Sequence, residues 1–355
     1  MELSYKWTLK EANFTKDKGK VFSCFACGGG STMGYKLAGF DVLGCNEIDP
    51  KMIEAYKVNH NPKYAYLEPI QTFKLRKDLP EELYNLDILD GSPPCSSFSM
   101  AGNRGDDWGK EKKFREGQAE QVLDTLFFDF IDLAKELQPK IVVAENVKGL
   151  LLGEARNYVR RILKEFDHAG YYVIYNLLDA SKMGVPQRRE RVFFTAIRKD
   201  LAKNLLKEID MFTSEPYLKL QFDEKPILFK DFYKLNSEND RPITAKETLR
   251  LWNLRQIGDS DLGNAALREG KIKFWNHKFL TLDSIPFTFP SGKDSCYLFD
   301  EARRPNKYEV CCIGSFPQDY NFNGNQYAYL VGMSVPPLMT ARLANELYIQ
   351  WLSKI

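Results

Sequence analysis

Cys95 is the residue whose surroundings in the chain most clearly suggest chemistry. It follows Asp90-Gly-Ser-Pro-Pro at the head of a polar loop. Residues 87–90, just before this loop, indicate the end of a short apolar strand. The Pro93-Pro94 pair favours extended backbone, which would hold the thiol out at the strand end. Two interpretations remain open on these residues alone. Cys95 is either a buried structural cysteine, because cysteine is among the most buried residue types, or a nucleophile on a loop that a rigid strand positions.

A carboxylate and two arginines follow other predicted strands. Glu145 comes directly after the apolar strand predicted over residues 141–144, at the sheet edge where ligands bind in parallel α/β proteins. A solvated charge at the strand end is the alternative. Arg189 and Arg191 lie at alternate positions before a strand predicted over residues 191–197, so they would share one face of an extended segment. They could bind a phosphate or an exocyclic oxygen, or form a surface charge run.

A glycine-rich turn, Phe25-Ala-Cys-Gly-Gly-Gly-Ser31, follows the first predicted strand, over residues 20–25. Glycines at a strand–helix junction let a ligand approach the backbone and the helix amides. Glu47 ends the second strand about 20 residues later, where such folds place a carboxylate on a ribose hydroxyl. The turn lacks GxGxxG, and no Lys-Ser/Thr follows it. A nucleoside ligand without a pyrophosphate therefore fits better than a dinucleotide, and a purely structural tight turn is the alternative.

The elements that would position these residues alternate between strand and helix through the first half of the chain. This alternation predicts an α/β fold with a doubly wound, mostly parallel sheet. From about residue 201 to 308 the pattern becomes irregular and predicts a second, smaller domain. Helical periodicity returns over residues 338–352. Strands are predicted over 20–25, 40–45, 86–89, 141–144, 172–177 and 191–197, and helices up to 37 and over 51–59, 123–137 and 159–169.

Composition sets the broad class of the protein. The 355 residues are 44% hydrophobic and 28% charged, as is usual for soluble globular proteins, and the net charge is only +2. This charge carries no bulk signature of nucleic-acid binding, although a local basic patch is compatible with it. The seven cysteines and three histidines lack the spacing of a metal site, and a reducing compartment, the cytoplasm, fits the cysteine usage. No membrane or secretion segment is predicted.

Taken together, these motifs resemble the DNA (cytosine-5)-methyltransferase family, of the bacterial or phage type. The resemblance covers nearly the whole chain, and the motifs occur in the family's order. That order is far more specific than any single motif. The matching segments are the glycine turn with Ala38-Gly39-Phe40, Asn46-Glu47, Pro94-Cys95 with Phe98-Ser99, Glu145-Asn146-Val147, Gln187-Arg-Arg-Glu-Arg191, Arg303-Arg-Pro-Asn with Phe316-Pro317, and Gly332-Met-Ser-Val-Pro-Pro337.

The resemblance implies an S-adenosylmethionine-dependent methyltransferase fold and methyl transfer to C5 of a cytosine flipped out of a specific duplex DNA sequence. Cys95 would attack C6 and form a covalent adduct. Glu145 would contact N3 and the exocyclic amine, and Arg191 the cytosine O2. Arg189 would support the catalytic loop or the adduct. The glycines at 102, 105 and 109, ahead of several cations, predict a loop over residues 99–118 that closes on the base.

The resemblance also implies the cofactor site and the partners. S-adenosylmethionine would lie across the glycine turn, with Glu47 on its ribose and Ile48 against the adenine. Duplex DNA and a cognate restriction endonuclease are the implied partners of a monomeric enzyme that contacts no membrane. Domains are expected over residues 1–200 (catalytic and cofactor-binding), 205–300 (target recognition) and 303–355 (a return to the catalytic domain). The implied cofactor-binding residues are Phe25, Ala26, Cys27, Gly28, Gly30, Glu47, Ile48, Ile70, Pro94 and Ser334.

Three residues depart from the family pattern. Cys27 stands where Gly is usual, Pro69 where an Asp commonly reads the adenine amine, and Met333 where Asn is usual. Glu68 could take the role of the missing Asp. These departures affect the expected cofactor contacts and leave the nucleophile, Glu145 and the arginines unchanged.

Three other functions fit the sequence less well. A tRNA cytosine methyltransferase belongs to a branch of the same family, but that branch has Thr where this chain has Ser99. A catalytically silent DNA-binding regulator would not need Cys95, Glu145 and Arg191. A nicotinamide-dependent dehydrogenase would need GxGxxG and has no use for the Pro-Pro-Cys loop.

Overall fold

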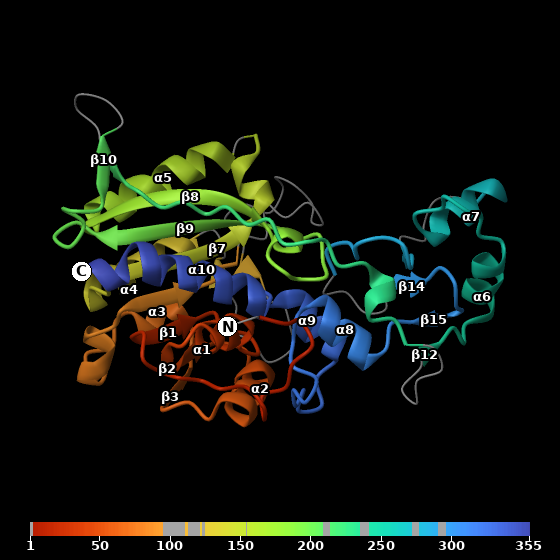
Figure 1. Cartoon of the computed structure of the whole chain (residues 1–355), viewed down its shortest axis with the longest axis horizontal. Coiled ribbons are helices and arrows are strands. Elements are labelled where there is room, and N and C mark those ends of the chain that lie inside the picture. The colour runs from red at the N-terminus through yellow and green to blue at the C-terminus, as the bar shows by residue number, and fades with distance from the viewer. Residues whose placement is uncertain are drawn as a thin grey trace.

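The chain forms a large lobe around one sheet and a smaller lobe beside it (Figure 1). The computed structural model describes residues 3–94, 111–112, 121–122, 125–153, 155–208, 214–234, 241–271, 277–289 and 296–355. Cys95, Ser99 and most of the segment 99–118 therefore lie outside the described residues.

The large lobe contains a seven-stranded sheet in the order β3-β2-β1-β4-β7-β9-β8. The first five of these strands run parallel, and β9 pairs antiparallel with both β7 and β8. The predicted doubly wound, mostly parallel sheet is confirmed, and its strand order reverses between β1 and β4. The strands are β1 (Lys20–Cys24), β2 (Asp41–Glu47), β3 (Tyr64–Leu67), β4 (Ile88–Gly91), β7 (Ile141–Val147), β8 (Tyr171–Asp179) and β9 (Glu190–Arg198).

Helices cover both faces of the sheet, and most residues of its central strands are therefore buried and apolar. Along β7, Val142 and Ala144 pack into the core beneath one face, and Ile141 and Val143 into the core beneath the other. Alternate residues of a strand point to opposite faces, so a strand buried on both sides is apolar at most positions, and its few polar side chains need hydrogen-bond partners, as Ser23 of β1 and Asp90 of β4 have in each other. The first face carries α3 (Ile70–Phe73), α4 (Leu126–Leu137) and α5 (Ala155–His168), and the second carries α1 (Gly30–Leu37) and α10 (Pro337–Gln350).

The smaller lobe has a core of its own, in which Leu251, Trp252, Leu262, Phe279 and Tyr297 are buried together. Two short strand pairs and two helices surround this core (Figure 1). The stretch predicted to be irregular thus contains two short helices. The elements are β12 (Arg241–Pro242), α6 (Lys246–Asn253), α7 (Leu262–Arg268), β13 (Lys278–Leu280), β14 (Cys296–Leu298) and β15 (Arg303–Arg304).

Residues 206–208 and 214–222 lie against the large lobe. The strands β10 (Leu206–Glu208) and β11 (Ser214–Pro216) form an antiparallel pair, and Leu218, Leu220 and Phe222 pack onto the core that α1 and α10 cover. The chain therefore crosses to the smaller lobe only after this segment. A further short pair, β5 (Glu111–Lys112) with β6 (Gln121–Val122), precedes α4.

Two helices that sequence periodicity did not predict, α8 (Lys307–Ile313) and α9 (Tyr327–Met333), lie between the lobes (Figure 1). They share a further core with α2 (Pro50–His60), with Phe229 of the short helical turn η6 (Phe229–Asp231) and with Phe232, which follows this turn. The N-terminal residues Tyr5, Trp7 and Leu9 also pack onto this core.

Candidate active site

Of the described residues that were predicted to do chemistry, Glu145 and Arg191 lie at the carboxyl end of β7, on the sheet edge where the glycine turn follows β1 and where the chain leaves β4. Ligands of open α/β sheets bind at this edge. The described chain leaves β4 at Gly91 and continues to Pro94, immediately before Cys95. The side-chain amide of Asn146 donates a hydrogen bond to the carbonyl oxygen of Pro93 at 3.0 Å. This bond fastens the Pro93-Pro94 segment to β7, one residue from Glu145.

Glu145 lies inside β7 and does not follow it, because the strand continues to Val147. The extension exists because β9 pairs antiparallel with this end of β7, and Val147 stands opposite Arg191. The pairing brings the Arg191 Nε to 2.8 Å from the Glu145 Oε1. Only 14% of the arginine side chain and 11% of the glutamate side chain are exposed, so the pair is nearly buried and is still reachable from the sheet edge.

Arg189 is buried and contacts a different part of the chain. Its Nη1 donates to the carbonyl oxygen of Gly332 at 3.0 Å, at the end of α9. Burial and the neighbouring Arg191 lower the pKa of Arg189 to about 9, so the guanidinium stays charged at neutral pH. Its Nε has no hydrogen-bond partner among the described residues. A buried donor of this kind is costly unless a ligand or another segment accepts from it.

The glycine turn joins β1 to α1 with three left-handed residues, Phe25 (φ 53°), Cys27 (φ 49°) and Gly29 (φ 87°). Ala26, Gly28 and Gly30 are buried between them. Left-handed backbone is unfavourable for residues other than glycine. Cys27 therefore occupies a position where a glycine would be less strained, and its side chain contacts Met52, with the two sulfur atoms 3.5 Å apart.

Glu47 lies beside this turn and is held by backbone amides. Its Oε2 accepts from the Cys27 N–H at 2.7 Å, and its Oε1 accepts from the N–H groups of Ile48 and Asp49, each at 2.8 Å. Burial raises the pKa of Glu47, and the three amide bonds oppose this effect. Oε2 accepts a single amide, so it keeps a lone pair for a hydroxyl donor. The pair Cys27–Glu47 thus has the chemistry that a ribose requires.

The other residues implied for the cofactor site are spread around the turn. Ile70 begins α3 and is buried in the core beneath the sheet, whereas Ile48 and Pro94 are half-buried. Ser334 is buried, and its hydroxyl donates to the Leu330 carbonyl at 2.8 Å.

Of the three positions that depart from the family pattern, Cys27 lies in the glycine turn itself, and Pro69 and Met333 lie at helix ends. Glu68 forms an ion pair with Arg76 at 2.8 Å, and Pro69 precedes α3. Met333 is 43% exposed at the end of α9, next to Ser334.

Asp90 is a site residue that the sequence motifs did not single out. It lies in β4 and accepts hydrogen bonds from Ser23 (2.6 Å), from Ser31 of α1 (2.8 Å) and from Tyr35 (3.2 Å). Burial raises the pKa of this carboxyl to about 6. An aspartate that ends an apolar strand was the available signal, because a carboxylate is seldom buried unless it is paired.

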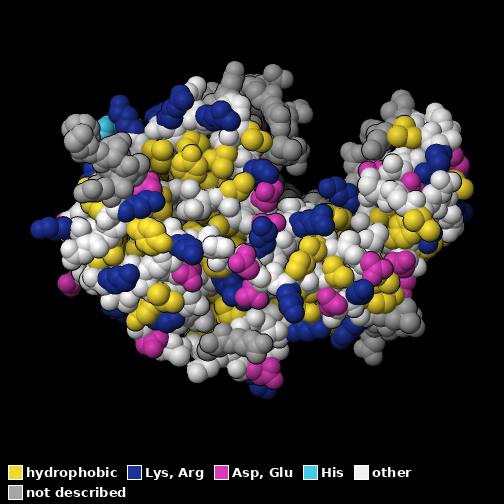
Figure 2. Space-filling model, turned by 45° about the horizontal axis from the view of Figure 1, so that its top comes forward, with side chains coloured by type: hydrophobic (Ala, Val, Ile, Leu, Met, Phe, Trp, Pro, Cys, Tyr) yellow, Lys and Arg dark blue, Asp and Glu magenta, His cyan; other side chains and the backbone are white. Residues whose placement is uncertain are grey.

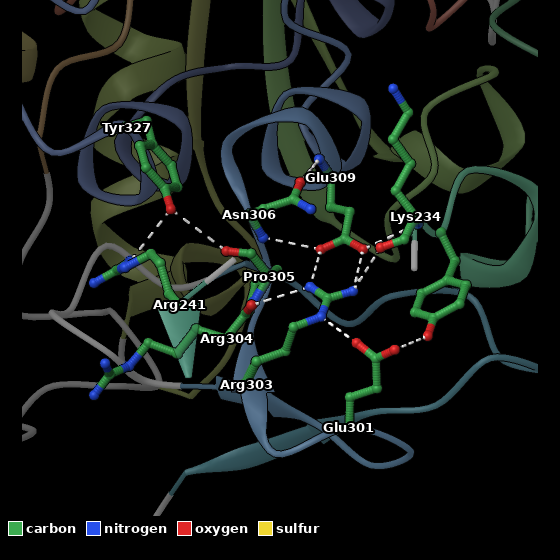
Figure 3. A network of polar contacts seen from close by, with 10 residues as sticks. Lys234, Arg241, Glu301, Arg303, Arg304, Pro305, Asn306, Glu309 and Tyr327 are labelled. Atoms are coloured by element: carbon green, nitrogen blue, oxygen red, sulfur yellow. Dashed lines mark hydrogen bonds and ion pairs between the residues drawn. The ribbon is translucent and has the colours of Figure 1, made fainter. Parts of the chain in front are cut away.

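A second network of polar contacts joins the smaller lobe to α8 (Figure 3). Arg303 of β15 donates from Nη1 and Nη2 to the two carboxylate oxygens of Glu309, each at 2.8 Å. Its Nη2 also donates to the Lys234 carbonyl at 3.0 Å, and its Nε donates to Glu301. The network thus holds the chain where it leaves the large lobe, at Lys234, and where it returns, at Arg303.

Residues 271–278, Lys-Ile-Lys-Phe-Trp-Asn-His-Lys, form a basic, aromatic segment that could meet phosphates and stack on bases, or be a solvated face with a buried Trp. The segment is described only at its ends, and residues 272–276 lie outside the described residues. The Lys271 ammonium forms an ion pair with Glu247 at 2.6 Å. The Lys278 ammonium lies 5.0 Å from the ring centroid of Phe287. The partner of Lys271 thus lies on α6 of the smaller lobe, whereas Phe287 packs on the core that α8 and α9 share.

The described residues show no second candidate site of another kind. Within the described ranges, no group of three His, Cys, Asp or Glu side chains could hold a metal ion, and no helix has the length and apolar character to cross a membrane. A cavity of about 520 Å³ lies at the opposite, amino edge of the sheet. Its lining includes Asp87 and Lys140, which form an ion pair at 2.8 Å, and it contains no residue predicted for the active site.

Comparisons with known proteins agree with this geometry. The family model described as C-5 cytosine-specific DNA methylase matches residues 19–348. The chain is 40% identical over 321 residues to the type II methyltransferase M.FnuDI of Fusobacterium nucleatum, covering 85% of this chain and 86% of the relative. It is 29% identical over 350 residues to the type II methyltransferase M.NgoPII of Neisseria gonorrhoeae, covering 92% and 94%.

A solved structure of DNMT2 from Spodoptera frugiperda superimposes with a TM-score of 0.62. Its sequence is 19% identical, and the match covers 93% of this chain and 99% of that chain. At this level of sequence identity, the match shows that the two proteins share a fold and shows nothing further.

Proposed function

The chain belongs to the C-5 cytosine-specific DNA methylase family and methylates cytosine C5 in DNA, and we propose that it does so through a covalent adduct of Cys95. The observation that carries this proposal is the Glu145–Arg191 ion pair beside Asn146. The Asn146–Pro93 hydrogen bond directs the chain toward this pair two residues before Cys95. A nucleophile, a carboxyl group and a guanidinium would then meet at one sheet edge.

Cytosine C5 is a poor nucleophile, and the proposed chemistry changes this. Attack of the Cys95 thiolate on C6 forms a C6–S bond and moves the electron pair of the C5–C6 double bond onto C5. Glu145 contacts N3 and the exocyclic amine, and Arg191 contacts O2. The guanidinium stabilises the negative charge that the attack pushes onto the ring, and the Glu145 carboxyl group holds a proton at N3 that neutralises this charge. After methylation, water removes the C5 proton, and the electron pair released re-forms the double bond and expels the thiolate.

S-adenosylmethionine is the methyl donor in this proposal, and it supplies an electrophilic methyl group when bound. The residues beside the glycine turn fit its nucleoside portion, because Glu47 keeps a free lone pair next to the Cys27 amide. Ile48 would pack on the adenine, and Ser334 would lie near the methionine end. The exposed Met333, which replaces the usual Asn, would change the contacts at that end.

Duplex DNA would enter the hollow between the lobes. Figure 2 shows that the surface is hollowed there, with Lys and Arg side chains along the lower border of the hollow. Such side chains bind phosphates without regard to sequence. The target cytosine must leave the base stack to reach Glu145 at the sheet edge.

The smaller lobe would read the target sequence. We expect the target-recognition domain over residues 205–300, of which residues 206–208 and 214–222 pack on the large lobe and the part from residue 241 onward forms the smaller lobe. We also infer a monomeric enzyme that serves beside a cognate restriction endonuclease. The similarity to two relatives named type II methyltransferases supports this partner.

Transfer of tritiated methyl groups from S-adenosylmethionine to duplex DNA and to tRNA tests the proposal. We expect label in DNA and none in tRNA, at sites that bisulfite sequencing then maps. Label in tRNA alone would overturn the substrate, and a protein that labels neither substrate would be the catalytically silent regulator. Calorimetry with S-adenosylhomocysteine tests the donor separately, and a wild-type protein that does not bind it would contradict the cofactor proposal.

A further inference from the structure

The carbonyl group of Gly28, in the glycine turn, is held by two buried side chains from other parts of the chain. The Tyr320 hydroxyl donates to this oxygen at 2.5 Å, and the His60 Nε2 lies 3.3 Å from it. Tyr320 is fully buried, and His60 is 7% exposed at the end of α2. Neither residue was singled out by the motifs in the sequence.

His60 acts here as a neutral hydrogen-bond donor. Burial and the nearby Lys36 lower the pKa of His60 to about 3, so the ring is uncharged at neutral pH. A neutral imidazole has one N–H, and a hydrogen bond to the Gly28 oxygen requires that proton on Nε2. The His60 ring packs on Tyr56, with ring centroids 4.6 Å apart, and this contact orients it.

The glycines of the turn make room for these two side chains. A Cβ at Gly28 would lie 2.7 Å from the Tyr320 hydroxyl oxygen, and a Cβ at Gly29 would lie 2.2 Å from the His60 Nε2. Both distances are too short for real atoms. Gly28 and Gly29 therefore permit close approach by protein groups, in addition to the backbone conformation that a turn needs.

Tyr320 is in turn supported by the N-terminal segment, residues 5–10, which precedes the part of the chain that the family model matches. The Asp319 carboxylate accepts from the backbone N–H groups of Leu9 (2.7 Å) and Lys10 (3.0 Å). The Gln318 N–H donates to the Trp7 carbonyl at 2.9 Å, and the Trp7 indole N–H donates to the Ser315 carbonyl at 2.9 Å. Four hydrogen bonds thus fasten the loop 315–320 to the N-terminal segment.

We propose that Tyr320, supported by residues 5–10, is a positioning residue that sets the orientation of the glycine turn for S-adenosylmethionine. A peptide group is planar, so fixing the Gly28 oxygen fixes the whole Gly28–Gly29 peptide plane. The Gly29 N–H of the same plane donates to the Ala26 carbonyl at 2.8 Å, which locks its other side. The neighbouring Cys27 amide, which holds Glu47, then keeps its direction. The inference rests on the proposed cofactor site.

Tyr320→Phe tests this role, because it removes the hydroxyl and keeps the ring. We expect the Kd for S-adenosylhomocysteine, measured by calorimetry, to rise about 3- to 10-fold, as for one lost hydrogen bond. The KM for S-adenosylmethionine should rise similarly, while kcat at saturation and the Kd for cognate duplex DNA stay unchanged. A role in folding alone would lower the melting temperature and leave the cofactor Kd of the folded protein unchanged.

Tyr171→Phe is the matched control. Tyr171 is also fully buried, and its hydroxyl donates to a backbone carbonyl, that of Pro139, at 2.8 Å, but it lies in β8 and away from the turn. We expect a similar fall in melting temperature and an unchanged cofactor Kd. Equal cofactor Kd values for Tyr320→Phe and wild type would overturn the inference.

Asp319→Asn tests the support from the N-terminal segment, because it weakens the charge-assisted bonds to the Leu9 and Lys10 amides. We expect the cofactor Kd to rise about 2- to 5-fold, less than for Tyr320→Phe. An unchanged Kd would remove residues 5–10 from the inference. If wild-type protein binds no S-adenosylhomocysteine at all, the proposed function fails instead, so the two failures are distinguishable.

Discussion

Glu145 and Arg191 form the part of the site that the described structure defines most closely, since one oxygen and one nitrogen meet at 2.8 Å in nearly buried surroundings. The sequence could predict that both residues serve the same edge of a sheet. It could not predict their pairing, because this depends on the antiparallel register of β9 against β7. A βαβ pattern by itself favours parallel neighbours. The resemblance of the ordered motifs supplied the roles that spacing alone left open.

Glu145→Gln should lower methyl transfer by about 10²-fold or more, because an amide cannot hold a proton at N3 that neutralises the charge on the attacked ring. Binding of S-adenosylhomocysteine, measured by calorimetry, should stay nearly unchanged. Glu190→Gln is the control, since Glu190 directly precedes Arg191 in the chain but forms an exposed ion pair with Lys148. If Glu145→Gln instead lost affinity for S-adenosylhomocysteine and kept normal turnover, Glu145 would belong to the cofactor site and not to the cytosine site.

Asp90 should make the folded state less stable as the pH rises. Burial raises its pKa from 3.8 to about 6, so the folded protein holds this proton more tightly than the unfolded chain does. The resulting contribution to the free energy of unfolding is complete below pH 3.8 and is lost as the pH rises through 6. The rise in pKa corresponds to about 3 kcal/mol.

Asp90→Asn removes this titration. The unfolding free energy of wild type minus that of the variant should therefore fall by about 3 kcal/mol between about pH 3 and pH 7, as measured by urea unfolding at several pH values. Parallel curves for the two proteins would show that the Asp90 carboxyl does not titrate in this way.

At the scale of elements, long apolar strands and amphipathic helices were predicted within a few residues of their observed bounds. The short helices α8 and α9 were missed, because seven residues are too few to show helical periodicity. One local signal for α8 was present. Asn306 and Glu309 have the spacing of a capping box, and the structure shows both of its hydrogen bonds.

The Arg303–Glu309 pair should hold α8 to the smaller lobe, because both side chains are almost fully buried. Arg303→Met leaves the Glu309 charge unpaired and should lower the free energy of unfolding by about 3–5 kcal/mol in urea titrations. Arg250→Met breaks an exposed network with Glu247 and Glu269 and should cost about 1 kcal/mol or less. Equal losses of unfolding free energy in the two variants would mean that the buried Arg303–Glu309 pair contributes no more to stability than the exposed network does.

At the scale of the whole molecule, the main surprise is how far apart in the chain the packed segments lie. Gly34 of α1 lies so close to α10 that a Cβ there would come within 2.4 Å of the Pro337 carbonyl oxygen. The Gln187 side chain similarly donates to the Ile313 carbonyl at 3.0 Å and accepts from the Phe289 N–H at 3.2 Å. Periodicity indicates that a helix has a buried face, but it does not say which distant segment covers that face.

Exchanging residues 205–300 for the equivalent region of a relative should transfer the sequence preference and retain the chemistry. The reason is that the smaller lobe has its own core, whereas Glu145, Arg189 and Arg191 lie in the large lobe. Bisulfite sequencing of methylated plasmid measures the outcome. Because residues 206–208 and 214–222 pack on the large lobe, a second exchange limited to residues 241–300 is the matched control. Unchanged methylation sites in both exchanges would refute the assignment of target recognition.

The central claim, covalent catalysis by Cys95 on cytosine in DNA, is tested most directly with duplex DNA that carries 5-fluorocytosine at the target site. Fluorine cannot leave as a proton does, so the adduct should persist after methyl transfer. With S-adenosylmethionine present, we predict a stable complex whose mass equals protein plus DNA plus one methyl group less the thiol hydrogen, with the DNA attached through the Cys95 sulfur. Cys95→Ser should form no such complex. Absence of the adduct in wild type, or its persistence in Cys95→Ser, would contradict the claim.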